Sequence, residues 1–158
     1  MSAQIQATDA VNELATLLIP INGKQLVLPN VTVAEIIHFS EPVPEEDQPN
    51  WFLGYFNWRD TQIPLVAFES INDEPFVSQG NSRRIAVLNG IIDDPKLPFC
   101  GIVTEGVPRL MRVVADEVAT DSDANLGPAE LSRVLVSGEK ATIPNVDYIQ
   151  GEVVKIIK

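Results

Sequence analysis

The chain has 158 residues, of which 45% are hydrophobic and 21% charged, and its formal net charge is −11. This length and composition are typical of about one soluble globular domain. The negative charge disfavours sequence-independent binding of nucleic acid or of an anionic membrane surface, because both require clustered cations. Cys100 is the single cysteine, which excludes an internal disulfide and favours a reducing compartment. We therefore expect a cytoplasmic protein.

The chain begins with a polar segment, residues 1–12, for which a frayed end and a short helix are both open. This segment lacks the basic start and apolar run of a signal peptide. No run approaches the roughly 18 apolar residues of a membrane span, so direct membrane insertion is not expected. Residues 14–21 and 25–28 are apolar runs separated by Asn22-Gly23, which predicts a β-hairpin.

A short helical turn and a loop are predicted next. Thr32 and Glu35 have the spacing of a capping box, which predicts a helical turn before Ile36. Residues 40–50 contain three prolines and four acidic residues, so they predict a surface loop. His38, the single histidine, is expected at the surface or half-buried at the end of a strand.

The segment from Trp51 to Phe68 predicts a second β-hairpin, with residues 60–62 as its polar turn. Side chains alternate along a strand. We therefore expect Phe56 and Trp58 to face a core.

The opposite face of this hairpin carries the polar residues. The alternation places Tyr55, Asn57 and Arg59 together on it. Arg59 has two interpretations. It is either an exposed recognition point, since arginine is enriched at interface hot spots, or the internal partner of an acidic side chain.

The second half of the chain reads as short strands separated by loops. Strands are predicted at residues 84–88, 99–104, 107–114, 133–136, 147–149 and 152–157. The intervening segments predict loops at residues 72–82 and 116–132, the latter with a helical turn after Pro128. Roughly ten short strands spaced by turn signals indicate an all-β barrel or sandwich.

Catalytic, cofactor and metal sites are not predicted. His38 and Cys100 lack the neighbouring ligands of a zinc site and the neighbouring base of a nucleophile. The glycines are isolated at turns and form no phosphate-binding loop. We therefore expect a protein that acts by binding, without enzymatic activity and without a cofactor.

Three motifs in register resemble the CheW-like family of chemotaxis coupling proteins. The signature G-x-x-N-L-R-G is matched by residues 54–60, with Trp58 in place of leucine and Asp60 in place of the last glycine. An earlier V-x-E-I motif is matched by residues 33–36. A later G-x-x-V-D-x-V motif is matched by residues 101–107, with glutamate in place of aspartate.

This resemblance implies a CheW-like domain over residues 13–158, built from two packed five-stranded SH3-like barrels, with residues 1–12 as an N-terminal extension. It implies an adaptor that couples a CheA-type histidine kinase to the cytoplasmic tip of a methyl-accepting chemoreceptor. The signature arginine is tied to coupling in the family, and that role falls on Arg59, flanked by Asn57 and Asp60. The departures suggest a divergent member, for example of a type IV pilus motility system.

The groove between the two barrels is the expected docking place for a receptor helix, which requires apolar walls. Wall candidates are Val33, Ile36 and Ile37, although they fit an ordinary core equally well. A second hypothesis is another SH3-like module that binds proline-rich peptides on an aromatic surface. That hypothesis requires Trp51, Tyr55 and Trp58 to be exposed together.

Overall fold

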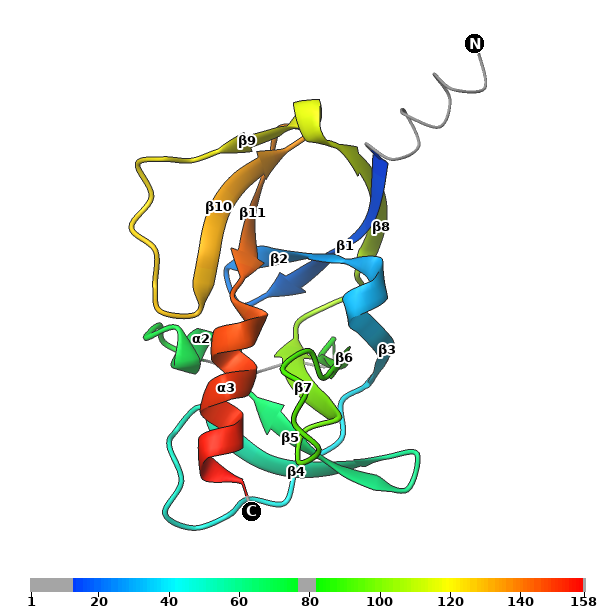
Figure 1. Ribbon diagram of the computed structural model, residues 1–158, viewed down its shortest axis with the longest axis vertical. Helices are drawn as coiled ribbons and strands as arrows, with labels where there is room; N and C mark the ends of the chain where they lie inside the picture. The colour runs from blue at the N-terminus through cyan, green and yellow to red at the C-terminus, as the bar shows by residue number, and fades with distance from the viewer. Residues whose placement is uncertain (1–12, 77–81, 158) are drawn as a thin grey trace.

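The computed structural model describes residues 13–76 and 82–157, which form two curled β-sheets stacked along the long axis of the molecule (Figure 1). The predicted extension at residues 1–12 and part of the predicted loop at 72–82 lie outside the described residues. The two sheets confirm the predicted all-β fold. They are called the upper and lower barrel, as they lie in Figure 1.

The upper barrel combines the first strands of the chain with the last. Its sheet has the order β8-β1-β2-β11-β10-β9. Its strands are β1 (Glu13–Ile21), β2 (Lys24–Pro29), β8 (Arg109–Val114), β9 (Val118–Thr120), β10 (Glu130–Val136) and β11 (Glu139–Pro144). The short η2 helix (Ala115–Glu117) joins β8 to β9. This sheet therefore has six strands where five were predicted, because β9 adds a three-residue edge.

The lower barrel is formed by the continuous middle part of the chain. Its sheet has the order β3-β6-β7-β5-β4. Its strands are β3 (Val33–His38), β4 (Phe52–Trp58), β5 (Thr61–Val66), β6 (Arg84–Asn89) and β7 (Phe99–Thr104). The one-turn helix α2 (Phe68–Ile71) follows β5, and η1 (Asn30–Thr32) connects β2 to β3.

The strands that border the junction between the barrels are buried on both faces. In β1, Leu18 packs inside the upper barrel, while Ile19 packs in a core shared by both barrels. In β7, Val103 packs inside the lower barrel, while Ile102 packs in the shared core. This two-sided burial explains the nearly continuous apolar run at residues 14–21, since no face of such a strand needs polar residues.

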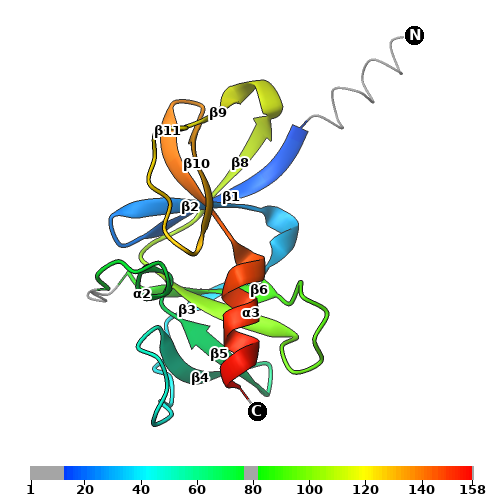
Figure 2. The ribbon, with the colours of Figure 1, turned by 60° about the vertical axis from the view of Figure 1, so that its left-hand side comes forward.

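The last element corrects the sequence prediction. Residues 147–149 and 152–157, predicted as strands, belong to or adjoin the helix α3 (Val146–Ile156), which runs along the junction and the lower barrel (Figure 2). The prediction is wrong because it followed the β-branched residues instead of their spacing. Asn145 caps the helix, since its Oδ1 accepts a hydrogen bond of 3.1 Å from the amide of Tyr148. The buried positions recur at helical intervals, at Val146, Ile149, Gln150 and Val153.

Two smaller predictions of helical turns are also wrong. The capping-box pattern of Thr32 and Glu35 forms no helical turn, because β3 begins at Val33 directly after the 3-10 helix η1. The segment after Pro128 makes a plain turn into β10, which begins three residues before the predicted strand. In both places pairing with a neighbouring strand outweighs the local signal.

A buried carboxylate organises the base of the upper barrel. Glu130 accepts two hydrogen bonds from Arg133, at 2.8 and 2.9 Å, and one from the amide of Gly127 at 2.8 Å. Lys24 Nζ lies 3.8 Å from the same carboxylate. Burial opposes ionisation of Glu130, but these donors and cations outweigh it and lower its pKa to about 2.

The same region joins the two barrels through polar contacts. Asn72, which ends α2 of the lower barrel, accepts a hydrogen bond of 2.9 Å from the amide of Ala129 in the upper barrel. Lys24 of β2 forms an ion pair with Glu74, which follows α2. The relative position of the barrels is therefore fixed by directional contacts as well as by the shared apolar core.

Cys100 provides a direct test of that shared core. Its side chain is fully buried, and burial raises the pKa of its thiol to about 12. Since the thiolate is the reactive species, we expect no modification of the native protein by a thiol reagent at pH 8, and complete modification after unfolding in denaturant. Rapid labelling of the folded protein would show that the junction opens in solution.

Candidate functional site

The hairpin of β4 and β5 ends in a tight turn at one side of the lower barrel. Arg59 and Asp60 are its two central residues, with φ of 49° and 62°, so the predicted turn at residues 60–62 lies one residue too late. Positive φ at both positions is typical of a type I′ hairpin turn. The predicted alternation is confirmed up to Trp58, since Phe56 and Trp58 are buried and Asn57 is exposed.

A β-bulge in β3 directs Glu35 toward this turn. Val33 pairs with Leu88, and Glu35 pairs with Val87, so Ala34 is an extra residue on β3. Bulges re-aim the side chains that follow them. Glu35 therefore stands on the side of β3 that faces the interior of the lower barrel, as its partner Val87 does.

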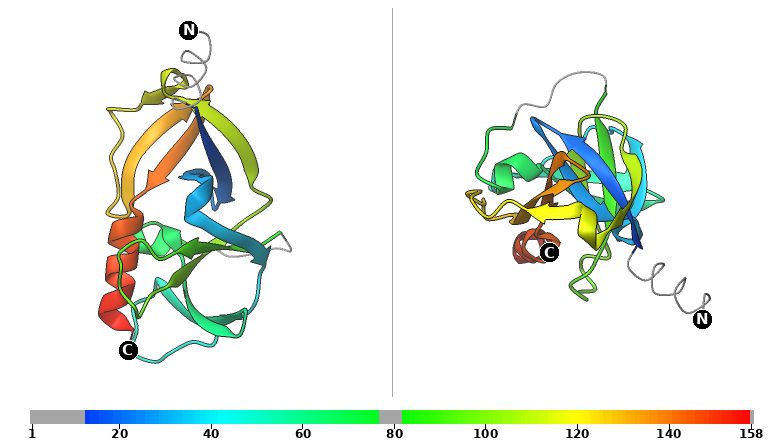
Figure 3. Two further views of the ribbon diagram at one scale, coloured as in Figure 1. Left: turned by 45° about the vertical axis from the view of Figure 1, so that its right-hand side comes forward. Right: turned by 90° about the horizontal axis from the view of Figure 1, so that it is seen from above.

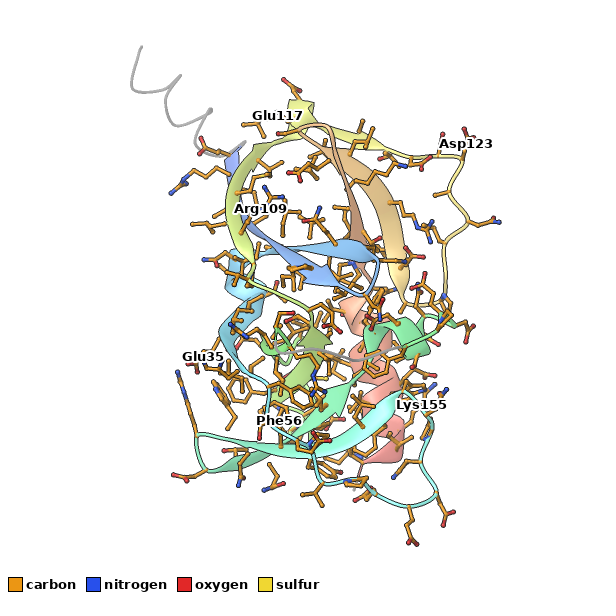
Figure 4. The ribbon with its side chains drawn as sticks, turned by 180° about the vertical axis from the view of Figure 1, so that it is seen from behind. Glu35, Phe56, Arg109, Glu117, Asp123 and Lys155 are labelled. Carbon is orange, nitrogen blue, oxygen red and sulfur yellow. The ribbon has the colours of Figure 1, made fainter. Side chains whose placement is uncertain are left out.

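Glu35 meets the hairpin across the open side of the barrel (Figure 4). Its Oε1 accepts a hydrogen bond of 2.8 Å from Trp58 Nε1 and lies 3.4 Å from Arg59 Nη2. The guanidinium of Arg59 also lies over the indole of Trp58, 4.5 Å from the ring centroid. Since β3 and β4 are the two edges of the sheet, Glu35 closes the lower barrel with side chains.

This cluster of Glu35, Trp58 and Arg59 combines both earlier interpretations of Arg59. The arginine has an acidic partner, but its side chain remains 69% exposed and that of Glu35 43% exposed. An ion pair at such exposure contributes little to stability. Arg59 is therefore held in one orientation while most of its guanidinium stays accessible to another molecule.

Beside the cluster, the other polar residues of the signature are also exposed. Asn57 Oδ1 accepts a hydrogen bond of 2.6 Å from Gln62 Nε2 on the neighbouring strand. Asp60 occupies the tip of the turn and is exposed. The structure thus brings Asn57, Arg59 and Asp60 together at one end of the hairpin.

The three apolar candidates do not share one surface. Val33 and Ile36, both half-buried, pack against the core at the junction between the barrels. Ile37, also half-buried, packs against the core inside the lower barrel. The bulge at Ala34 explains this division, because it interrupts the alternation of the strand.

The aromatic residues of the hairpin form no common exposed surface. Trp58 is buried and packs edge-on against Phe99 inside the lower barrel, with ring centroids 4.7 Å apart. Trp51 and Tyr55 are half-buried and pack against the shared core instead. This arrangement counts against a peptide-binding surface formed by Trp51, Tyr55 and Trp58.

The first glycine of the signature has a backbone role. Gly54 has φ of 125°, and a Cβ atom there would lie 2.2 Å from the carbonyl oxygen of Val43. The adjacent Tyr55 exchanges two backbone hydrogen bonds with Val43, at 2.8 and 3.1 Å. Gly54 therefore allows the loop at residues 40–50 to attach to β4.

Two motifs that stand 23 residues apart in the sequence thus meet in space, Glu35 from V-x-E-I and Arg59 from the signature. Comparison with known families agrees with this pairing. The sequence profile of the CheW-like domain matches residues 15–152. The chain belongs to the CheW-like family. CheW-like domains are non-enzymatic scaffolds of chemotaxis signal transduction.

A solved structure shows the same fold. The crystal structure of the scaffolding protein CheW from Thermoanaerobacter tengcongensis is 12% identical in sequence, with a TM-score of 0.70, and the match covers 83% of this chain and 88% of that one. It supports the assignment of two SH3-like barrels. No curated protein sequence matches the chain. Within residues 13–76 and 82–157, no helix is long and apolar enough to cross a membrane.

Sequence reasoning missed Glu35 as a member of the site, although it quoted the residue twice. The capping-box reading assigned the carboxylate to a helix end. The better signal was the V-x-E-I motif itself, which stands in register with the signature. A charged residue between apolar neighbours on an edge strand also indicates a side chain with a specific partner.

Proposed function

We propose that this CheW-like protein couples a CheA-type histidine kinase to the cytoplasmic tip of a methyl-accepting chemoreceptor. Membership of the family supports a scaffold role in chemotaxis-like signalling. The observation that carries the proposal is the cluster of Glu35, Trp58 and Arg59, where two signature motifs converge at an accessible arginine. An oriented, exposed arginine is a frequent hot spot of protein interfaces.

The kinase surface in this proposal is the end of the β4–β5 hairpin. Arg59 is the central contact, and Asn57 and Asp60 lie beside it. Because the hairpin is anchored by Trp58 inside the barrel, binding orders few additional groups. The acidic neighbours Glu35 and Asp60 favour a partner that presents both a cation and an acceptor.

The receptor surface in this proposal lies at the junction between the barrels. The helix α3 and the segment of η1 and β3 lie on opposite sides of the molecule there, so α3 leaves the β3 side uncovered (Figure 3). Val33 and Ile36 reach this side as half-buried residues, and Val31 of η1 is 81% exposed. Apolar residues at such a junction suit the apolar face of a receptor helix.

Calorimetry with the regulatory domain of a CheA-type kinase from the same cell tests the kinase contact. We expect the wild-type protein to bind, and Arg59→Ala to weaken binding at least about tenfold, as expected for a hot-spot arginine. Arg109→Ala is the matched control, since Arg109 is also an exposed, ion-paired arginine but lies on the upper barrel. Its binding should stay within a factor of about two of the wild type.

Thermal unfolding of each variant separates the possible results. A folded Arg59→Ala variant with unchanged affinity would show that the cluster is not the kinase contact. Loss of binding together with loss of the fold would make Arg59 a structural residue. If the wild type binds no kinase domain at micromolar concentration, the coupling proposal fails in this form. A place in a type IV pilus system stays a prediction.

A further inference from the structure

The interior of the upper barrel contains an unfilled apolar cavity of about 310 Å³. Its walls are mainly valines, including Val27, Val113, Val134 and Val136. Its polar side chain, Thr16, already donates its hydroxyl to the carbonyl oxygen of Met111 at 2.9 Å. A cavity of this volume lies at the lower end of the range of small-molecule sites.

The cavity is open to solvent at its rim. Leu14 follows the alternation of Thr16 and Leu18 and therefore points into the barrel, yet it is 51% exposed. The edges of the sheet, β8 and β9, are joined by η2 and are not neighbours in the hydrogen-bonded order of the described strands. An inward-facing leucine at this exposure shows that the barrel does not close over its own core.

The two barrels fill their interiors differently. The lower barrel contains Phe56 and Trp58, with Phe39, Phe76 and Phe99 packed against them. All ten aromatic residues of the chain lie outside the six strands of the upper barrel, whose core is formed by aliphatic residues. Interiors of natural proteins are close-packed, and lost contacts around a void reduce stability. The upper barrel therefore lacks the ring that the lower barrel supplies from its own sequence.

We propose that this cavity binds a small uncharged aromatic molecule, of about the size of the indole ring that fills the lower barrel. The aliphatic walls offer dispersion contacts to a ring and leave no hydrogen-bonding group for a polar ligand. A charged ligand would lose its hydration without receiving a partner. Such a ligand would give the scaffold a site separate from the cluster around Arg59, so this proposal is independent of kinase binding.

Indole is the direct probe, because it is the side-chain ring of Trp58. Titration into protein with labelled methyl groups should shift the NMR signals of Val27, Val134 and Val136, with a dissociation constant of about 1 mM or lower. Saturating indole should also raise the melting temperature, because the ligand binds the folded state. Indole-3-carboxylate, which adds a charge to the same ring, should produce neither effect.

A filled cavity should no longer bind the probe. Val118→Phe places a ring at the half-exposed rim on β9 and should weaken indole binding at least tenfold, with an unchanged or higher melting temperature. Val114→Phe provides a second filled variant if the first does not fold. The matched control is Leu135→Phe, which adds a ring on the outer face of β10 and should bind indole as the wild type does.

Three results would overturn the proposal. The first is the absence of methyl shifts with indole at millimolar concentration. The second is equal binding by the wild type and a folded filled variant. The third is equal binding of indole and its carboxylate, which would indicate stacking at the surface.

Discussion

Replacing Gly54 by alanine is expected to destabilise the protein by about 3 kcal/mol or more. The new Cβ would lie 2.2 Å from the carbonyl oxygen of Val43, and φ of 125° is a conformation that alanine strongly disfavours. Relief of the clash requires the loss of two backbone hydrogen bonds between Val43 and Tyr55. Chemical denaturation of the variant beside the wild type measures the effect.

A second glycine offers a control of opposite sign. Gly151 lies inside α3, where an added Cβ would meet no atom within 4 Å and φ is not positive. Gly151→Ala should therefore stabilise the protein by up to about 1 kcal/mol, because alanine has the higher helix propensity. Equal destabilisation by both substitutions would contradict the assigned role of Gly54, as would a Gly54→Ala variant as stable as the wild type.

Replacing Glu130 by glutamine should cost about 3 kcal/mol of stability at pH 7, with a cost that disappears in acid. The folded pKa of about 2 lies below the ordinary value of 4.5, so the ionised carboxylate stabilises the folded state above pH 4.5. This contribution is lost as the pH falls from 4.5 to about 2. The difference between the two values corresponds to about 3 kcal/mol. Urea unfolding of both proteins between pH 2 and 7 measures this convergence.

Glu139 is the matched control for Glu130. It accepts hydrogen bonds from Arg109 on the same barrel, but its side chain is 41% exposed. Hydrogen bonding to Arg109 lowers its pKa, yet solvent screens an exposed pair, so Glu139→Gln should change stability by less than about 1 kcal/mol. If Glu130→Gln cost the same at every pH, packing and not charge would explain the effect of Glu130.

The sequence predicted the elements whose signals are local. The first hairpin follows from Asn22-Gly23, and the second from the aromatic alternation ending at Trp58. The helix α3 was equally readable from the cap at Asn145 and the spacing of its buried residues. It was missed because valine and isoleucine were weighed by strand propensity, which tertiary packing overrides.

The candidate site was predictable in part. The signature located Asn57, Arg59 and Asp60 at the end of a hairpin, but a one-residue shift of the turn moved Arg59 out of the strand. The contact of Glu35 with Trp58 depends on the bulge at Ala34 and on the approach of two edge strands. Neither has a local sequence signal, since both arise from packing between residues far apart in the chain.

The order of the strands sets the order in which the barrels can assemble during synthesis. Residues 33–104 contain all strands of the lower barrel, so this barrel is complete while the ribosome is still adding the rest of the chain. The upper barrel needs β1 and β2 from the start of the chain and β11, which ends at Pro144. The apolar strands at residues 13–29 must therefore wait without their final partners, which makes them the part of the nascent chain most dependent on protection from aggregation.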